Sequence, residues 1–126
     1  MAFIFTNPNP GRKLVGDCVI RAISIISGKE WEQVYIELAV QGFMMYDMSS
    51  SNDVWSAYLH RNNFKRYVIP DSCPDCYTVR EFVDDHPYGD YILATGTHVI
   101  AVKDGNYYDT WDSGDEVPIY YFKKET

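Results

Sequence analysis

A cysteine stands where a helix is predicted to begin. In GDCVIRAIS, residues 16–24, Cys18 follows Gly16 and Asp17 and precedes a mostly apolar run. The unpaired N–H groups and the macrodipole at a helix N-terminus favour an anion, so they lower the pKa of a thiol placed there. They also leave backbone donors that can hold an oxyanion. The position predicts that Cys18 is a nucleophile, which needs a base beside it and a group that orients the base.

His98 is the predicted base. His60 lies at the end of a predicted helix and His86 precedes a proline, so both are interpreted as solvated. His98 instead opens the apolar run HVIAV, residues 98–102. An imidazole at the mouth of such a strand is either an edge residue with satisfied hydrogen bonds or a site group that exchanges protons near neutral pH.

Asp109 is predicted to orient His98. The Asp-Gly dipeptide at 104–105 is typical of a two-residue hairpin turn. Such a turn pairs His98 with Trp111 and places Asp109 on the same face as a diagonal neighbour. Trp111 is then expected to form a wall of the substrate site. Asp112 is the alternative third member, because a three-residue loop or a bulge would reverse the face.

These residues resemble the papain-like cysteine peptidase superfamily. The resemblance rests on DCVIRAIS, on the His98 of GTHVIAV and on YDTWDSG. The layout is most similar to the bacteriocin-leader peptidase domains of export transporters and to small uncharacterised phage and prophage proteins. It implies a papain-like fold, in which a central Cys-bearing helix packs on a C-terminal antiparallel sheet, and hydrolysis of an amide through a thioester.

The chain departs from these families at one position. They usually carry a glutamine six residues before the nucleophile as an oxyanion donor, and here that position is Arg12. The candidates to replace it are Arg12 itself, Asn9 and Asn7, beside the backbone N–H of Cys18.

The elements that position these residues change from helices to strands along the chain. In the first helix, Arg21, Ser24 and Ser27 form a narrow polar strip, so that helix is predicted to be central. Thr78 and Glu81 form the capping box of a short helix that ends at Pro87. Apolar periodicity and turn residues predict an α+β domain with helices at about 18–27, 29–41 and 54–61 and strands at 64–69, 90–94, 98–102, 106–111 and 117–122.

Composition bounds the class of protein. The chain has 126 residues, 46% of them hydrophobic, which predicts one packed domain over residues 1–126. A net charge of −7 argues against a nucleic-acid partner and favours basic peptides or proteins. No signal peptide or membrane span is recognisable. Three cysteines, an odd number, favour a reduced chain and a cytoplasmic location.

The CPDC segment has the spacing of a zinc-ligand pair. Only one such pair exists, and structural zinc normally takes four nitrogen or sulfur ligands, so Cys73 and Cys76 are interpreted as part of a turn. No metal and no cofactor is predicted. A thioredoxin-like redox pair is disfavoured because no helix begins at Cys73.

Two functions follow from these residues. The first is a small cysteine hydrolase or acyl transferase that acts on a peptide or protein amide through Cys18, His98 and Asp109. The alternative is a non-catalytic binding module of the same fold, such as a phage-encoded protein that captures a host protein. The missing glutamine favours the second function, whereas the complete set of three catalytic residue types favours the first.

Overall fold

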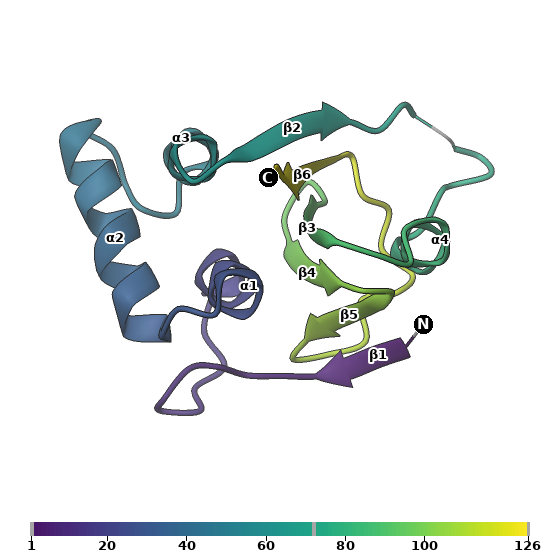
Figure 1. Ribbon diagram of the computed structural model, residues 1–126, viewed down its shortest axis with the longest axis horizontal. Coiled ribbons are helices and arrows are strands. Elements are labelled where there is room, and N and C mark those ends of the chain that lie inside the picture. Colours follow the sequence, from purple (N-terminus) through teal and green to yellow (C-terminus); the bar gives the residue numbers. More distant parts are fainter. Residues whose placement is uncertain (1, 72, 126) are drawn as a thin grey trace.

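The computed structural model describes residues 2–71 and 73–125 as an α+β arrangement, as the sequence predicts (Figure 1). Four helices and six strands make up the described chain. The helices are α1 (Cys18–Ser27), α2 (Trp31–Met44), α3 (Asn52–Arg61) and α4 (Val79–Asp85). The strands are β1 (Ala2–Phe5), β2 (Phe64–Val68), β3 (Asp90–Ala94), β4 (Val99–Lys103), β5 (Asn106–Asp109) and β6 (Tyr120–Lys124).

The six strands form one mixed sheet in the order β1-β5-β4-β3-β6-β2. The expectation of a purely antiparallel C-terminal sheet is wrong at one edge, where β1 pairs parallel to β5 with Phe5 beside Asp109. The AFIF segment of β1 was not predicted as a strand, because four apolar residues carry little periodicity and its partner lies about a hundred residues away in the chain. This parallel pair ties the N-terminus to the strand that carries Asp109.

The β4–β5 hairpin has the predicted register. Val102 pairs with Tyr107, and Lys103 with Asn106. The turn residues Asp104 and Gly105 both have positive φ, at 48° and 81°. Positive φ at both positions is what a tight hairpin turn requires, and aspartate followed by glycine adopts it at low cost.

Helices cover both faces of the sheet, and α1, α2 and α3 gather on one of them (Figure 1). Because successive side chains of a strand point to opposite faces, Ile92 packs under α1 and Leu93 packs under α4. The core is therefore two apolar layers with the sheet between them, and α1 is the helix that lies directly against β4.

The buried face of α1 differs from the expectation. Arg21 and Ser24, assigned to a polar strip, are only 6% and 7% exposed, although Ser27 is exposed as predicted. Ser24 donates from Oγ to the carbonyl oxygen of Lys29 at 2.7 Å, and Arg21 pairs with carboxylates. Satisfied polar groups can be buried at modest cost, so a polar period of three does not by itself mark a solvated face.

Local signals set most helix ends. The predicted capping box is confirmed, since Thr78 accepts from the backbone of Glu81 and the Glu81 side chain accepts from the Thr78 N–H. Gly28 ends α1 in the left-handed conformation, with φ of 75°. The second helix runs to Met44, three residues past its predicted end, and the last strand begins at Tyr120 instead of residue 117.

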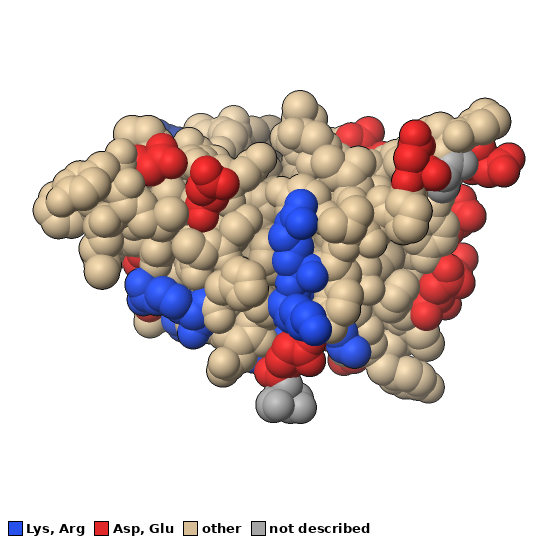
Figure 2. Space-filling model, turned by 90° about the horizontal axis from the view of Figure 1, so that it is seen from above, with Lys and Arg blue, Asp and Glu red and all other residues tan. Residues whose placement is uncertain are grey.

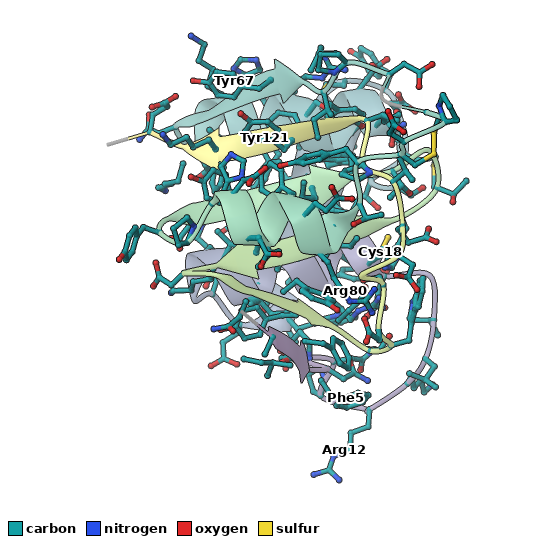
Figure 3. The ribbon with its side chains drawn as sticks, turned by 90° about the vertical axis from the view of Figure 1, so that its right-hand side faces the viewer. Phe5, Arg12, Cys18, Tyr67, Arg80 and Tyr121 are labelled. Atoms are coloured by element: carbon teal, nitrogen blue, oxygen red, sulfur yellow. A yellow bond between two sulfur atoms is a disulfide. The ribbon has the colours of Figure 1, made fainter. Side chains whose placement is uncertain are left out.

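The CPDC segment forms a disulfide between Cys73 and Cys76 (Figure 3). The expectation that all three cysteines are reduced is therefore wrong for this pair, whose Cα atoms lie 4.1 Å apart, and Cys18 is the free thiol. Within residues 2–71 and 73–125, no cluster of three or more His, Cys, Asp or Glu side chains suited to a metal occurs. None of the helices in these ranges is both long and apolar enough to cross a bilayer.

Candidate active site

Cys18 is the first residue of α1 and is half-buried against the core. Asp17 occupies the N-cap position, but its side chain makes no capping hydrogen bond to the first turn among the residues described. The first N–H groups of a helix have no intrahelical acceptor. The start of α1 therefore presents both the thiol and backbone donors to the same space.

The β4–β5 hairpin brings His98 to Asp109. His98 precedes β4, Asp109 ends β5, and His98 Nε2 donates to Asp109 Oδ2 at 2.6 Å. The side chains are 12% and 2% exposed, so the bond is shielded from water. Because Nε2 is engaged by the carboxylate, Nδ1 is the ring nitrogen left for the thiol of Cys18, with which His98 hydrogen-bonds.

A tight turn before β4 fixes the backbone of His98. The N–H of His98 donates to Thr95 Oγ1 at 3.0 Å, and the N–H of Thr95 donates to the carbonyl oxygen of His98 at 2.8 Å. The hydroxyl of Thr95 also accepts from the N–H of Thr97. These bonds fix the backbone of His98 just before β4.

Four donors hold the carboxylate of Asp109. Besides His98, the hydroxyl of Ser113 donates to Oδ2 at 2.7 Å, the N–H of Thr110 donates to Oδ1 at 2.8 Å, and Arg21 lies 3.5 Å from Oδ1. Ser113 is fully buried. The roles of Ser113 and Arg21 in holding Asp109 were not predicted from the sequence. The features that could have indicated them are a serine four residues after Asp109 and an arginine on an otherwise mostly apolar helix.

Arg21 links the site to Asp17, the residue before Cys18. Its guanidinium pairs with Asp17 as well as with Asp109. Asp17 also accepts from Trp31 Nε1 at 3.0 Å and from Asn9 Nδ2 at 3.4 Å. A buried polar network is stable when each of its groups has a hydrogen-bond partner. This network extends the chain of contacts that runs from the thiol of Cys18 through His98 to Asp109.

The electrostatics favour a thiolate beside an imidazolium. Burial acts to raise the pKa of Cys18, but the hydrogen bond and charge of His98, the N–H of Val99 and the charge of Arg21 outweigh burial and lower that pKa. Burial acts to lower the pKa of His98, but Asp109 and Cys18 outweigh it and raise the pKa to about 9. The pKa of Asp109 is lowered by His98 and Ser113 against the effect of its burial. The pKa of the acid, Cys18, is thus lowered and the pKa of the base, His98, is raised. Both changes favour an ion pair of thiolate and imidazolium near neutral pH.

Asp112, the alternative third member, has other partners. It pairs with Arg80 of α4 and accepts from the hydroxyl of Tyr107. The same loop is held by α4, whose first two N–H groups donate to the carbonyl oxygens of Gly114 and Glu116. Asp112 therefore fastens the loop after β5 to α4, and the structure brings Asp109 alone of the two to His98.

The predicted oxyanion donors do not meet at Cys18. Arg12 projects away from the molecule, well apart from Cys18 (Figure 3). The side chain of Asn9 is buried, with its amide directed at Asp17 and its Oδ1 accepting from Gly11. Asn7 accepts from the backbone of Asn9 in the same loop.

His60 and His86 lie outside this group of residues. His60 is exposed near the end of α3, as expected. His86 is half-buried rather than solvated, because its ring stacks on Phe82 with 3.8 Å between centroids and its Nδ1 lies 2.7 Å from the carbonyl oxygen of that residue.

Two hollows flank the thiol and the imidazole. One, of about 300 Å³, is bounded by Trp111, whose ring centroid lies 5.1 Å from that of His98. The other, of about 210 Å³, extends towards Ser50 and Gly96. Both include Gly16, Cys18, Thr97 and His98 in their walls. A ligand that reaches Cys18 thus finds space in either hollow.

No family model, no curated protein and no solved structure matches the chain.

Proposed function

We propose that this chain is a small papain-like cysteine hydrolase or acyl transferase that acts on a peptide or protein amide. The observation that carries the proposal is the continuous series of a helix-terminal thiol, an imidazole and a buried carboxylate, in which His98 donates to Asp109 at 2.6 Å. Nucleophile, base and orienting group in this order are what thiol catalysis requires.

The first half of the proposed reaction is acylation. The thiolate of Cys18 attacks the carbonyl carbon of the amide, and the carbonyl π electrons move to oxygen. The imidazolium of His98 then gives its proton to the leaving nitrogen as the C–N bond breaks. The products are a thioester on Cys18 and a free amine, while Asp109 holds the imidazole in place.

The second half is deacylation. Neutral His98 takes a proton from water, which attacks the thioester carbon and releases a carboxylic acid and the thiolate. If an amine or hydroxyl group takes the place of water, the acyl group is transferred to it. Trp111 covers one face of the imidazole and limits the access of solvent to it.

The start of α1 supplies the proposed oxyanion site. The backbone N–H of Cys18 is one donor, and Asp17 leaves the first turn uncapped. Donors aimed at the developing oxyanion contribute about 2.7–4 kcal/mol each in comparable hydrolases. A cytoplasmic location is part of the proposal, because the free thiol of Cys18 fits a reducing compartment; in that compartment the Cys73–Cys76 disulfide is expected to be reduced.

The test is covalent labelling of Cys18. At pH 6, iodoacetamide is expected to modify Cys18 rapidly, while Cys73 and Cys76 react only after reduction of their disulfide. The His98→Ala variant should label much more slowly at that pH, because the thiolate loses its imidazolium partner. Intact mass and peptide mapping report the site and the rate.

A peptide library separates the two functions. An enzyme forms an acyl adduct on Cys18 and releases products, and Cys18→Ser stops the turnover. A binding module keeps its affinity in Cys18→Ser and releases no product. Labelling of Cys18 at the rate of an ordinary exposed thiol would remove the basis for the proposal.

A further inference from the structure

The outer face of α2 is apolar, although no described part of the chain covers it. Val34 and Leu38 point into the core and are buried. Ile36, Val40 and Phe43 follow at i, i+4 and i+7 on the other side of the helix, where they are 61%, 49% and 79% exposed. Figure 1 shows α2 at the outer edge of the helices, with nothing drawn on the side away from α1 and α3. A helix that is apolar all round is normally buried all round, so this outer face calls for a partner.

The exposed apolar surface is large enough for a stable interface. It continues beyond the helix, because the segment after α2 turns back through a bond from the N–H of Asp47 to the carbonyl oxygen of Gly42. The exposed apolar side chains, which we call the α2 patch, are Tyr35, Ile36, Val40, Phe43, Met44, Met45, Tyr46 and Met48. Their exposed fractions amount to about 1,000 Å², at roughly 200 Å² for each fully exposed side chain. The largest apolar patch of a typical monomer is about 300–600 Å², and a standard interface removes about 800 Å² from each partner.

The α2 patch carries a projection and a hollow that fit each other. Phe43 is the projection, and a hollow of about 350 Å³ between α2 and α3 has Ile36 and Val40 in its wall. An apolar cavity of roughly 150 Å³ holds benzene, so the hollow can take a phenyl ring. Two α2 helices can pack antiparallel about a twofold axis that passes between Ala39 and Val40. Ile36 of each copy then lies opposite Phe43 of the other, because both residues are equally far from the axis.

We propose that the α2 patch joins two copies of this chain in a symmetric, antiparallel dimer. Both phenyl rings enter a hollow of the other copy at once, and such buried aromatic anchors carry most of the binding energy of an interface. The charged groups beside the hollow are already engaged, since Glu37 accepts from Lys29 at 2.8 Å and Arg61 donates to Gln41 at 2.6 Å. An entering ring therefore leaves neither charge without a partner. The dimer does not depend on the proposed catalysis.

Sedimentation of the full chain tests the dimer. Between about 1 and about 300 µM, the mass should rise from 14.6 kDa to twice that value, with a dissociation constant in the micromolar range or tighter. Added salt should strengthen the dimer, because each copy carries −7 and the antiparallel register brings Glu32 of one copy towards Asp47 of the other. A chain that stays at 14.6 kDa throughout would overturn the proposal.

Two charged variants test the register. Ile36→Lys and Phe43→Glu, studied separately, should each weaken self-association at least about tenfold, because each places two charges in the apolar contact. An equal mixture of the two should associate more tightly than either alone. In the mixed dimer, one contact keeps Ile36 against Phe43 and the other becomes a lysine–glutamate pair. Added salt should weaken this mixed dimer, in contrast to that of the parent chain.

The matched control is Tyr88→Glu, between α4 and β3, because Tyr88 is 81% exposed and lies outside the α2 patch. It should dimerise as the parent chain does. Circular dichroism and thermal unfolding check that each variant is folded. A dimer that survives both Ile36→Lys and Phe43→Glu, a mixture no tighter than its components, or an equal loss in Tyr88→Glu would each overturn the proposal. Because these measurements do not involve Cys18, their outcome is separate from that of the labelling experiments.

Discussion

Asp109 illustrates how one side chain is fixed by several segments of the chain. Its carboxylate accepts from the hairpin partner His98, from the following loop at Thr110 and Ser113, and from Arg21 on α1. With both oxygens engaged, it has little freedom to rotate. A carboxylate that accepts from this many donors stays ionised, and its negative charge favours the protonated form of the imidazole.

The first prediction concerns the pH at which Cys18 becomes reactive. In Asp109→Asn, the pKa of His98 should fall from about 9 towards its ordinary value, because the carboxylate that raises it is gone. Less imidazolium then stabilises the thiolate, so the rise of alkylation rate with pH should move to higher pH. Iodoacetamide labelling between pH 4 and 9 measures this shift.

The control for that experiment is Asp112→Asn, since this carboxylate pairs with Arg80 instead. Its profile should match that of the parent chain. A shifted profile in Asp112→Asn, with an unshifted one in Asp109→Asn, would contradict the assignment of the orienting group.

At the scale of elements, α4 supports the site from the opposite face of the sheet. Its first two N–H groups hold the carbonyl oxygens of Gly114 and Glu116, and Arg80 holds Asp112 and Asp115. These contacts fasten the loop that carries Ser113. The capped start of this short helix thus controls the loop that supports Asp109.

Gly114 gives the matching prediction. A Cβ at this position would lie 2.4 Å from the hydroxyl oxygen of buried Tyr107 and 2.9 Å from Cγ of Arg80, so Gly114→Ala forces the loop off α4. We expect a loss of about 1–3 kcal/mol in the free energy of unfolding, by analogy with overpacked cores. Urea denaturation measures it, and alkylation of Cys18 should slow in the same variant.

Gly96→Ala is the matched control, because a Cβ there meets nothing within 4 Å. Its free energy of unfolding should stay within about 0.5 kcal/mol of the parent value. Equal stability of the two alanine variants would show that the loop does not depend on its contact with α4.

Local signals made part of this architecture predictable. The Asp-Gly turn set the register of the hairpin, which in turn placed His98 beside Asp109. The parallel pairing of β1 with β5, the burial of Arg21 and the contact of Ser113 were not predicted. Each of these depends on partners distant in the chain or on loop geometry, which a local pattern of polar and apolar residues does not encode.

At the scale of the whole molecule, charge is unevenly distributed. The chain carries −7, yet Figure 2 shows Lys and Arg gathered mainly in a central stripe of one face, with acidic residues towards both ends. β2 and β6 contribute Lys65, Arg66, Lys123 and Lys124, and Arg66 lies 4.3 Å from the ring of Tyr120. The negative excess elsewhere favours approach of neutral or basic polypeptides.

The last prediction is the dependence of stability on pH. The pKa of His98 rises from 6.5 in the unfolded chain to about 9 on folding, so folding favours its protonated form. Its contribution is fully present below about pH 6.5 and is lost as pH rises through about 9. Cys18 is replaced by serine in both chains that are compared, because the proton that the thiol loses on folding would otherwise offset the one that His98 gains. The difference in free energy of unfolding between Cys18→Ser and the double variant Cys18→Ser/His98→Gln should therefore shrink as pH rises above about 6.5.

Urea denaturation at a series of pH values from 6 to 10 measures that difference. Comparing the two chains cancels the tyrosines and lysines that titrate near the alkaline end. A difference that stays constant or grows from pH 6.5 to 9.5 would contradict the charged state assigned to His98.

The strand order has a consequence for synthesis on the ribosome. β6 comes last of the six strands that the structure describes, yet it is not at an edge of the sheet and lies between β3 and β2. Cys18 emerges early, but its base and orienting group follow some eighty and ninety residues later, and the sheet beneath them closes only when β6 inserts. Contacts this distant in the chain form late, because a long loop must close first. In a nascent chain, Cys18 is therefore expected to remain an ordinary thiol until β6 has been made and the sheet beneath His98 and Asp109 has closed.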